Sequence, residues 1–143
     1  MAEIITEIKI LISLVGGTIA GLLGGCDVVL KALICFVCVD YLTGTVRAIK
    51  ERKLNSRTGF IGLLKKALIF AVILLAQVLD EVTGIGALRS VAALFYISNE
   101  GISITENLSL IGVKFPKRVK EVLEQLRNED KDDDNTEDTK SDN

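Results

Sequence analysis

Apolar residues gather in four segments along the first 111 residues of the chain. The first runs from Ile10 to Cys26 with no charged residue over 17 positions, and the others span 28–46, 67–79 and 91–111. A hydrocarbon core of about 30 Å is crossed by roughly 20 apolar residues in a helix. Four such segments leave no room for a soluble core. The pattern therefore predicts an all-α integral membrane protein, with three to four transmembrane helices within residues 1–113.

The end of the chain has a different pattern. Pro116 is tolerated in the first turn of a helix and disfavours continuation of a preceding one, so a new helix is expected there. Apolar residues then recur at helical spacing among charged ones, at Val119, Val122, Leu123 and Leu126. We predict a short cytoplasmic amphipathic helix over residues 114–127. Residues 128–143 contain no hydrophobic side chain and predict a disordered acidic tail.

Two of the apolar segments leave the number of spans open. The first is short and rich in glycine, and without its insertion the chain has three spans and an outer N-terminus. The fourth is cleanly apolar only over residues 91–98. To cross the membrane it must bury Glu100 near its middle.

Charge is distributed unevenly and predicts the orientation. Residues 1–127 carry 15 Lys and Arg against 11 Asp and Glu, a net of +4, whereas residues 128–143 carry 2 against 8, a net of −6. Residues 47–66 hold seven of the basic side chains and only one acidic one, Glu51. Short basic loops stay in the cytoplasm. We therefore expect a multi-pass protein of the bacterial cytoplasmic membrane with both termini inside and the turns at 24–27 and 80–86 outside.

Small residues in the first apolar segment form a candidate helix-packing face. Gly17, Gly21 and Gly25 lie four residues apart. In the second segment Gly44 is a weaker candidate for the same kind of close helix contact. Small residues at this spacing let two helix backbones approach closely in lipid. The face either packs within one subunit or joins subunits of a homo-oligomer.

Polar residues inside the apolar segments are the second candidate site. Asp40 lies within the second segment, where an ionisable side chain is costly and faces a protein partner or water. A polar stripe with steps of three and four runs along the fourth segment and consists of Tyr96, Asn99, Glu100, Ser103, Glu106 and Asn107. Such a stripe must be covered by helices or water. Asp40 either has a functional role or makes a structural hydrogen bond. The stripe either packs internally, lines an aqueous lesion, or belongs to a helix at the membrane surface.

Residues for enzyme or metal chemistry are sparse. The chain has no histidine, and Cys26, Cys35 and Cys38 lie in or beside apolar segments as small packing residues. An aspartyl dyad of Asp40 and Asp80 is disfavoured, because the two would lie about 10 Å apart in depth at about 1.5 Å per helical residue. We predict no catalytic residue, no cofactor, no metal and no nucleic-acid partner.

These residues resemble the clostridial toxin-secretion and phage-lysis holin family. The resemblance runs from the first apolar segment to Leu126 and rests on the order and spacing of several short motifs. They are Val39-Asp40-Tyr41-Leu42-Thr43-Gly44, Lys53-Leu54-Asn55-Ser56, the positions Gly59, Gly62 and Lys65, the run from Tyr96 to Asn107, and finally Gly112 and Pro116.

The resemblance implies a holin that accumulates in the inner membrane as harmless oligomers and then opens lesions. A cell-wall hydrolase (endolysin) or a large toxin escapes through them, which leads to lysis of the host cell. The family offers no catalytic residues to carry over, and the acidic tail departs from the commoner basic end. The alternative is a small ion or solute channel or transporter subunit that uses Asp40 and Glu100.

Overall fold

Five helices make up the described part of the chain. The structure, a computed structural model, describes residues 1–137, without the side chains of residues 2 and 128–137. In chain order the helices are α1 Ala2–Leu22, α2 Val28–Lys50, α3 Ser56–Thr83, α4 Leu88–Ile111 and α5 Lys117–Glu137. No strand occurs among these residues. The predicted all-α class is confirmed.

Polar caps and glycines set the helix boundaries. The Asp27 carboxylate accepts the Leu30 amide at 2.8 Å where α2 begins, and the Asn55 side chain accepts the Arg57 amide at 2.9 Å where α3 begins. Each bond satisfies an amide that has no acceptor within its helix. Both α3 and α4 end at glycines with left-handed backbone, Gly84 at φ 72° and Gly112 at φ 92°. An L side chain rarely adopts this conformation, so glycine is the residue suited to stop these helices.

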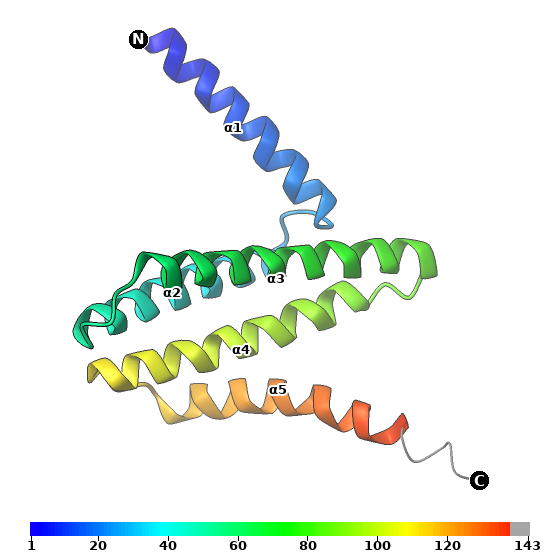
Figure 1. Cartoon of the computed structure of the whole chain (residues 1–143). Helices are drawn as coiled ribbons and strands as arrows, with labels where there is room; N and C mark the ends of the chain where they lie inside the picture. Colours follow the sequence, from blue (N-terminus) through cyan, green and yellow to red (C-terminus); the bar gives the residue numbers. More distant parts are fainter. Residues whose placement is uncertain (138–143) are drawn as a thin grey trace.

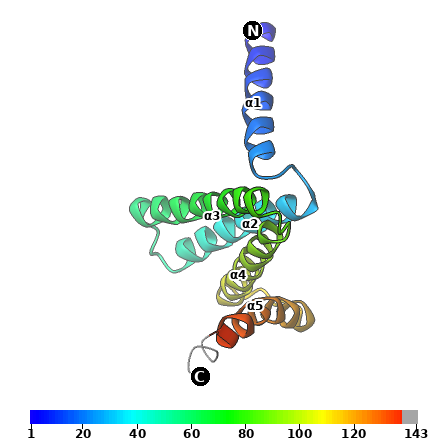
Figure 2. The same ribbon diagram turned by 90° about the vertical axis from the view of Figure 1, so that its right-hand side faces the viewer.

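Helix α4 is the centre of the bundle. It packs against α2, α3 and α5, whereas α2 and α3 contact each other less. Figure 1 shows α4 between the α2–α3 pair and α5, and Figure 2 shows the same arrangement from the side. Apolar side chains of α2, α3 and α4 form the core together with Leu23; they are Leu30, Leu33, Val37, Ile69, Ile73, Ala93 and Ile97.

Three helices are long and apolar enough to cross a membrane among the described residues. They cover Glu3–Leu22, Val28–Lys50 and Ser56–Thr83. Helix α4 is not one of them, because polar side chains recur along its length. These three candidate spans agree with the predicted three to four, and a fourth span through α4 stays a prediction.

Helix α1 projects away from the bundle formed by the other four (Figures 1 and 2). Its apolar side chains are exposed nearly throughout, and none of its candidate span is buried within the chain. Exposed apolar surface on this scale needs lipid or another protein to cover it.

Helix α5 runs back along α4 and is longer than the sequence predicted. It begins just after Pro116, but it continues to Glu137 rather than ending at residue 127. Leu123 is buried against α4, where it faces Gly101. The backbone of residues 128–137 is thus helical, which differs from the disordered acidic tail predicted over residues 128–143. Residues 138–143 lie outside the described residues, so for them disorder stays a prediction.

Candidate functional site

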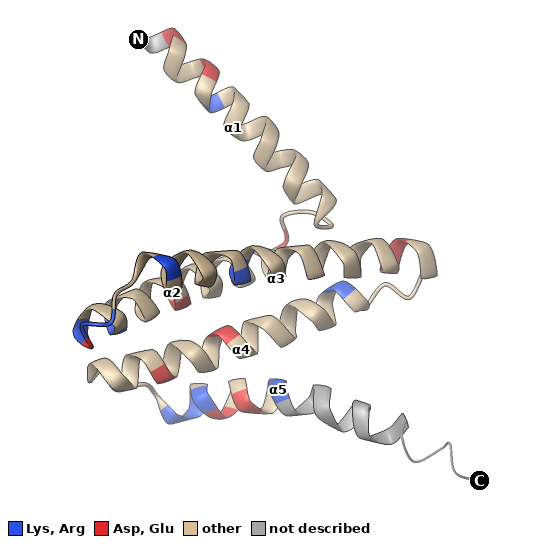
Figure 3. Cartoon of the chain, viewed as in Figure 1, with Lys and Arg blue, Asp and Glu red and all other residues tan. Residues whose placement is uncertain are grey.

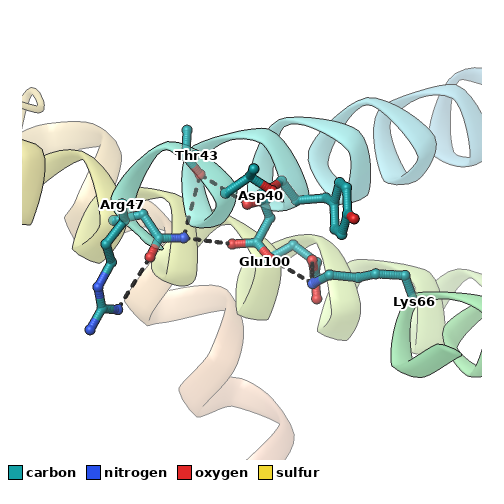
Figure 4. Close-up of polar contacts among 8 residues, drawn as sticks. Asp40, Thr43, Arg47, Lys66 and Glu100 are labelled. Atoms are coloured by element: carbon teal, nitrogen blue, oxygen red, sulfur yellow. Dashed lines mark hydrogen bonds and ion pairs between the residues drawn. The ribbon is translucent and has the colours of Figure 1, made fainter. Parts of the chain in front are cut away.

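A buried ionic cluster joins α2, α3 and α4 near their middle. The Lys66 ammonium of α3 lies 2.6 Å from the Asp40 carboxylate of α2 and also contacts the Glu100 carboxylate of α4. Figure 4 shows the ammonium reaching toward the two acidic side chains. One cation therefore bridges carboxylates that are 60 residues apart in the chain.

Asn107 extends this cluster toward the end of the bundle where α2 and α4 end. Its side-chain amide donates to Asp40 at 3.2 Å and to the Thr43 hydroxyl at 3.4 Å. Its carbonyl oxygen accepts from the Arg47 guanidinium at 3.4 Å. Arg47 in turn pairs with Glu51 at 2.9 Å, at the C-terminal end of α2. A continuous polar path thus leads from the middle of the bundle to its surface.

Burial makes the central part of the cluster energetically important. The Lys66 side chain is 16% exposed, and those of Asp40 and Glu100 are 9% exposed. Charges removed from water are costly unless each has a partner, and loss of one partner leaves an uncompensated charge. Two carboxylates around one ammonium give the cluster a formal charge of −1. A cleft of about 290 Å³ between α2 and α3 reaches Asp40 and Lys66 from outside.

The structure separates the predicted polar stripe of α4 into covered and uncovered parts. Glu100 and Asn107 are buried against α2 and α3, whereas Asn99 and Ser103 are half-buried and Glu106 is exposed. In the folded chain, Glu100 and Asn107 are therefore covered by α2 and α3 and do not face water.

The structure divides the predicted glycine face. Gly17 and Gly21 lie on α1, whereas Gly25 lies beyond its end at Leu22, has left-handed backbone (φ 97°) and does not continue the helix face. A methyl group added at Gly17, Gly21 or Gly25 would meet no atom within 4 Å. Gly44, in contrast, lies against α4, where such a group would come 3.6 Å from the Asn107 amide. The structure thus separates Gly17 and Gly21, which lie uncovered on α1, from Gly44, which lies beside the ionic cluster.

A second ionic cluster, which the sequence did not predict, ties the opposite end of the bundle together. The Arg89 guanidinium of α4 contacts Asp27 at 2.7 Å, donates to the Gly25 carbonyl at 3.2 Å and also reaches the Leu23 carbonyl. Asp80, from the last turn of α3, accepts the amides of Leu88 and Arg89 at 2.9 and 2.8 Å. Asp80 therefore caps α4 from another helix.

Two features of the sequence could have indicated this second cluster. Arg89 is the only basic residue between Lys66 and Lys114, and Asp27 immediately precedes an apolar run, as N-cap residues do. Two hydrogen bonds lower the pKa of Asp27 to about 2: the larger effect comes from the Arg89 side chain and the smaller one from the Leu30 amide. The carboxylate therefore stays ionised and keeps the loop before α2 attached to α4.

Most basic side chains lie at the end of the bundle opposite the Arg89–Asp27 cluster. They surround the α2–α3 connection and the start of α5 (Figure 3). All three cysteines are free thiols. Among the described residues, no group of three His, Cys, Asp or Glu side chains could hold a metal ion.

The sequence pattern of the bacteriophage holin family matches residues 17–128, which include α2, α3, α4 and both ionic clusters. This match covers most of the chain. The chain belongs to the bacteriophage holin family. Holins are membrane proteins that permeabilise the membrane and are not enzymes, so this chain is a membrane protein of the holin family.

Several relatives accompany this match. An uncharacterised 14.9 kDa protein of Clostridium perfringens is 41% identical over 130 residues, which are 90% of this chain and 98% of that protein. An uncharacterised protein of Bacillus subtilis, YqxH, is 44% identical over 70% of this chain and 72% of its own length. A probable holin of Bacillus phage phi105 is 44% identical over 54% of this chain and 58% of its own length. No solved structure matches this holin.

Proposed function

We propose that this holin oligomerises in the bacterial cytoplasmic membrane and opens lesions through which an endolysin or a large toxin leaves the cell. The observation that carries the proposal is α1, an apolar helix that projects from the bundle with its glycine face unoccupied. Within a bilayer, such a face is suited to close contact with the same face of a second copy. Family membership supports the resulting permeabilisation.

The orientation proposed for the chain follows from its basic end. The α2–α3 connection and the start of α5 carry the basic side chains, and we place this end in the cytoplasm. With α1, α2 and α3 as the three spans, the N-terminus is cytoplasmic and α3 ends outside. With α4 as a fourth span, both termini are cytoplasmic. The second arrangement, with both termini inside, is the one that the charge pattern favours.

If the subunits keep this fold, the polar stripe of α4 does not line the lesion. Glu100 and Asn107 face α2 and α3, so they reach water only if α4 separates from those helices. The outer side of α5, in contrast, already exposes Lys120 and Glu124 while Leu123 covers α4. Charged side chains cannot face acyl chains without a large free-energy cost. We infer that α5 faces water, either at the membrane surface or along the lesion.

A selective channel or transporter that uses Asp40 and Glu100 is the alternative. Both carboxylates do belong to one cluster, but the Lys66 ammonium lies between them. A cation that moved along this path would have to displace an ammonium that is already neutralised by two partners. The geometry therefore favours a structural role for the cluster within each subunit.

Inducible expression in a bacterium, with and without a co-expressed endolysin, tests the proposal. We expect growth to continue for a delay and then stop abruptly, with loss of membrane potential and, in the presence of endolysin, lysis. Graded and selective ion flux without release of a protein-sized reporter would indicate the channel instead. Steady growth with an intact potential, at high expression in the membrane, would refute permeabilisation.

A pair of matched variants tests the role of the α1 glycines. Gly17→Leu/Gly21→Leu adds bulk where no atom of the described chain lies, so the subunit fold should persist while the subunits separate. Ile19→Phe adds bulk on the opposite side of the same helix and should leave assembly unchanged. Light scattering of the proteins in detergent measures the oligomer mass. Equal masses for the wild type and the glycine variant would show that this face does not join subunits.

A further inference from the structure

A basic cleft of about 710 Å³ lies where α2 and α4 end and α5 begins. It is separate from the two ionic clusters, although Arg47 contributes to its wall. Its basic lining residues come from three parts of the chain: Arg47 of α2, Lys114 of the α4–α5 connection, and Lys117 and Lys120 of α5. Among the residues that line it, Glu106 is the one acidic side chain.

The cations of this cleft are only partly neutralised by the protein. Arg47 pairs with Glu51, and Lys120 lies 3.7 Å from Glu124. Lys114 and Lys117 have no ion-pair partner among the described residues. In the first turn of α5 the amides of Val119 and Lys120 donate to the Pro116 carbonyl, which leaves those of Lys117 and Arg118 free in the described part of the chain, and such amides favour a bound anion. The cleft therefore combines unpaired cations, free amides and enough volume for an anionic group.

The remaining wall of the cleft is apolar and exposed. Leu110 is 52% exposed and Val113 is 49% exposed, and Phe115 lies beside them. The cleft opens at the end of the bundle where α2, a candidate membrane span, ends at Lys50. A soluble inorganic anion gains nothing from exposed Leu and Val side chains, whereas a lipid places its phosphate beside the start of its acyl chains.

We propose that this cleft binds the phosphodiester headgroup of an anionic phospholipid of the inner leaflet. The phosphate lies between Lys114, Lys117 and Lys120 at the start of α5, and Leu110 and Val113 contact the upper part of the acyl chains. Juxtamembrane lysines favour anionic lipids in this way. The bound lipid would connect the α4–α5 turn to the membrane surface. This proposal rests on the proposed cytoplasmic placement of this end, and it requires a membrane protein but not a lytic one.

Native mass spectrometry of the full-length protein in a neutral detergent tests the proposal. The probes are phosphatidylglycerol, phosphatidylcholine of equal chain length, and inorganic phosphate as a competitor. The site variant is Lys114→Gln/Lys117→Gln, and the charge-retaining variant is Lys114→Arg/Lys117→Arg. The matched control is Lys65→Gln/Arg118→Gln, which removes two basic side chains that do not line the cleft.

We expect phosphatidylglycerol to bind in preference to phosphatidylcholine, and the site variant to bind it about tenfold more weakly, while the control changes affinity by less than about twofold. The arginine variant should retain binding, which separates loss of the site from loss of the fold. Equal weakening in the site and control variants would overturn the proposal in favour of general surface charge. Displacement of the lipid by equimolar inorganic phosphate would overturn the lipid assignment.

Discussion

Replacement of Lys66 by Met is the perturbation that most directly tests the buried ionic cluster. It removes the one ammonium that contacts both Asp40 and Glu100, whose side chains are 9% exposed. Removal of one partner from a buried ion pair costs about 3–5 kcal/mol, because the remaining charge is left without compensation. Since two carboxylates lose their partner here, we expect the free energy of unfolding to fall by an amount in the upper part of that range.

Lys65→Met is the matched control for this variant. Lys65 is the neighbouring residue, is exposed and has no ion-pair partner among the described residues. Exposed substitutions of this kind change stability by less than about 0.5 kcal/mol. The assay is reversible unfolding in mixed micelles of rising dodecyl sulfate content, followed by circular dichroism.

A neutral version of the cluster should restore most of the lost stability. In Lys66→Met/Asp40→Asn/Glu100→Gln no buried charge remains at these three positions, so the cost of an uncompensated buried charge, which dominates the loss in Lys66→Met, is removed. If Lys66→Met costs under about 1 kcal/mol, or if the triple variant is no more stable than the single one, the reasoning from burial and charge is refuted.

Two further predictions concern the ends and the outer surface of the bundle. The pKa of Asp27 is lowered by Arg89, so its contribution to stability should be complete above pH 3.8 and be lost as the pH falls to about 2; the difference in melting temperature between wild type and Asp27→Asn should shrink over the same interval. Gly101→Leu should displace α5, because an added Cβ would lie 2.6 Å from a Leu123 methyl carbon, and such overpacking costs about 1–3 kcal/mol. Limited proteolysis after residue 116 measures that displacement.

Controls for these two predictions come from the same chain. A melting-temperature difference that stays constant from pH 5 to pH 2 would contradict the assignment of Asp27 as the titrating partner of Arg89. For α5, Gly62→Leu adds the same bulk where no atom lies within 4 Å. Equal protease sensitivity in both glycine variants would show that Gly101 does not determine how α5 packs.

Local chemistry in the sequence predicts the helical class, the starts of α2 and α5 and the end of α4, whereas α1 and α3 begin earlier than their apolar segments. The apolar segments correspond to α1–α4, and the turn at 24–27 lies between α1 and α2 as expected. The turn predicted at 80–86 is shorter in the structure, because α3 continues through Thr83. Asp80 lies within its last turn and caps α4 with its side chain. That role could not be predicted, since the capping residue belongs to a different helix.

The sequence by itself determined which stretches are apolar enough for a membrane, where the charge changes sign, and that Asp40 and Glu100 are unusual at their positions. Only the tertiary structure decided that Lys66 lies between these two carboxylates, that Asn107 connects them to Arg47, and that Leu123 of α5 covers Gly101. Hydrophobic periodicity reflects the burial of each helix separately. Partners across helices depend on the rotation and depth of every helix against its neighbours, and those are set by packing among residues far apart in the chain.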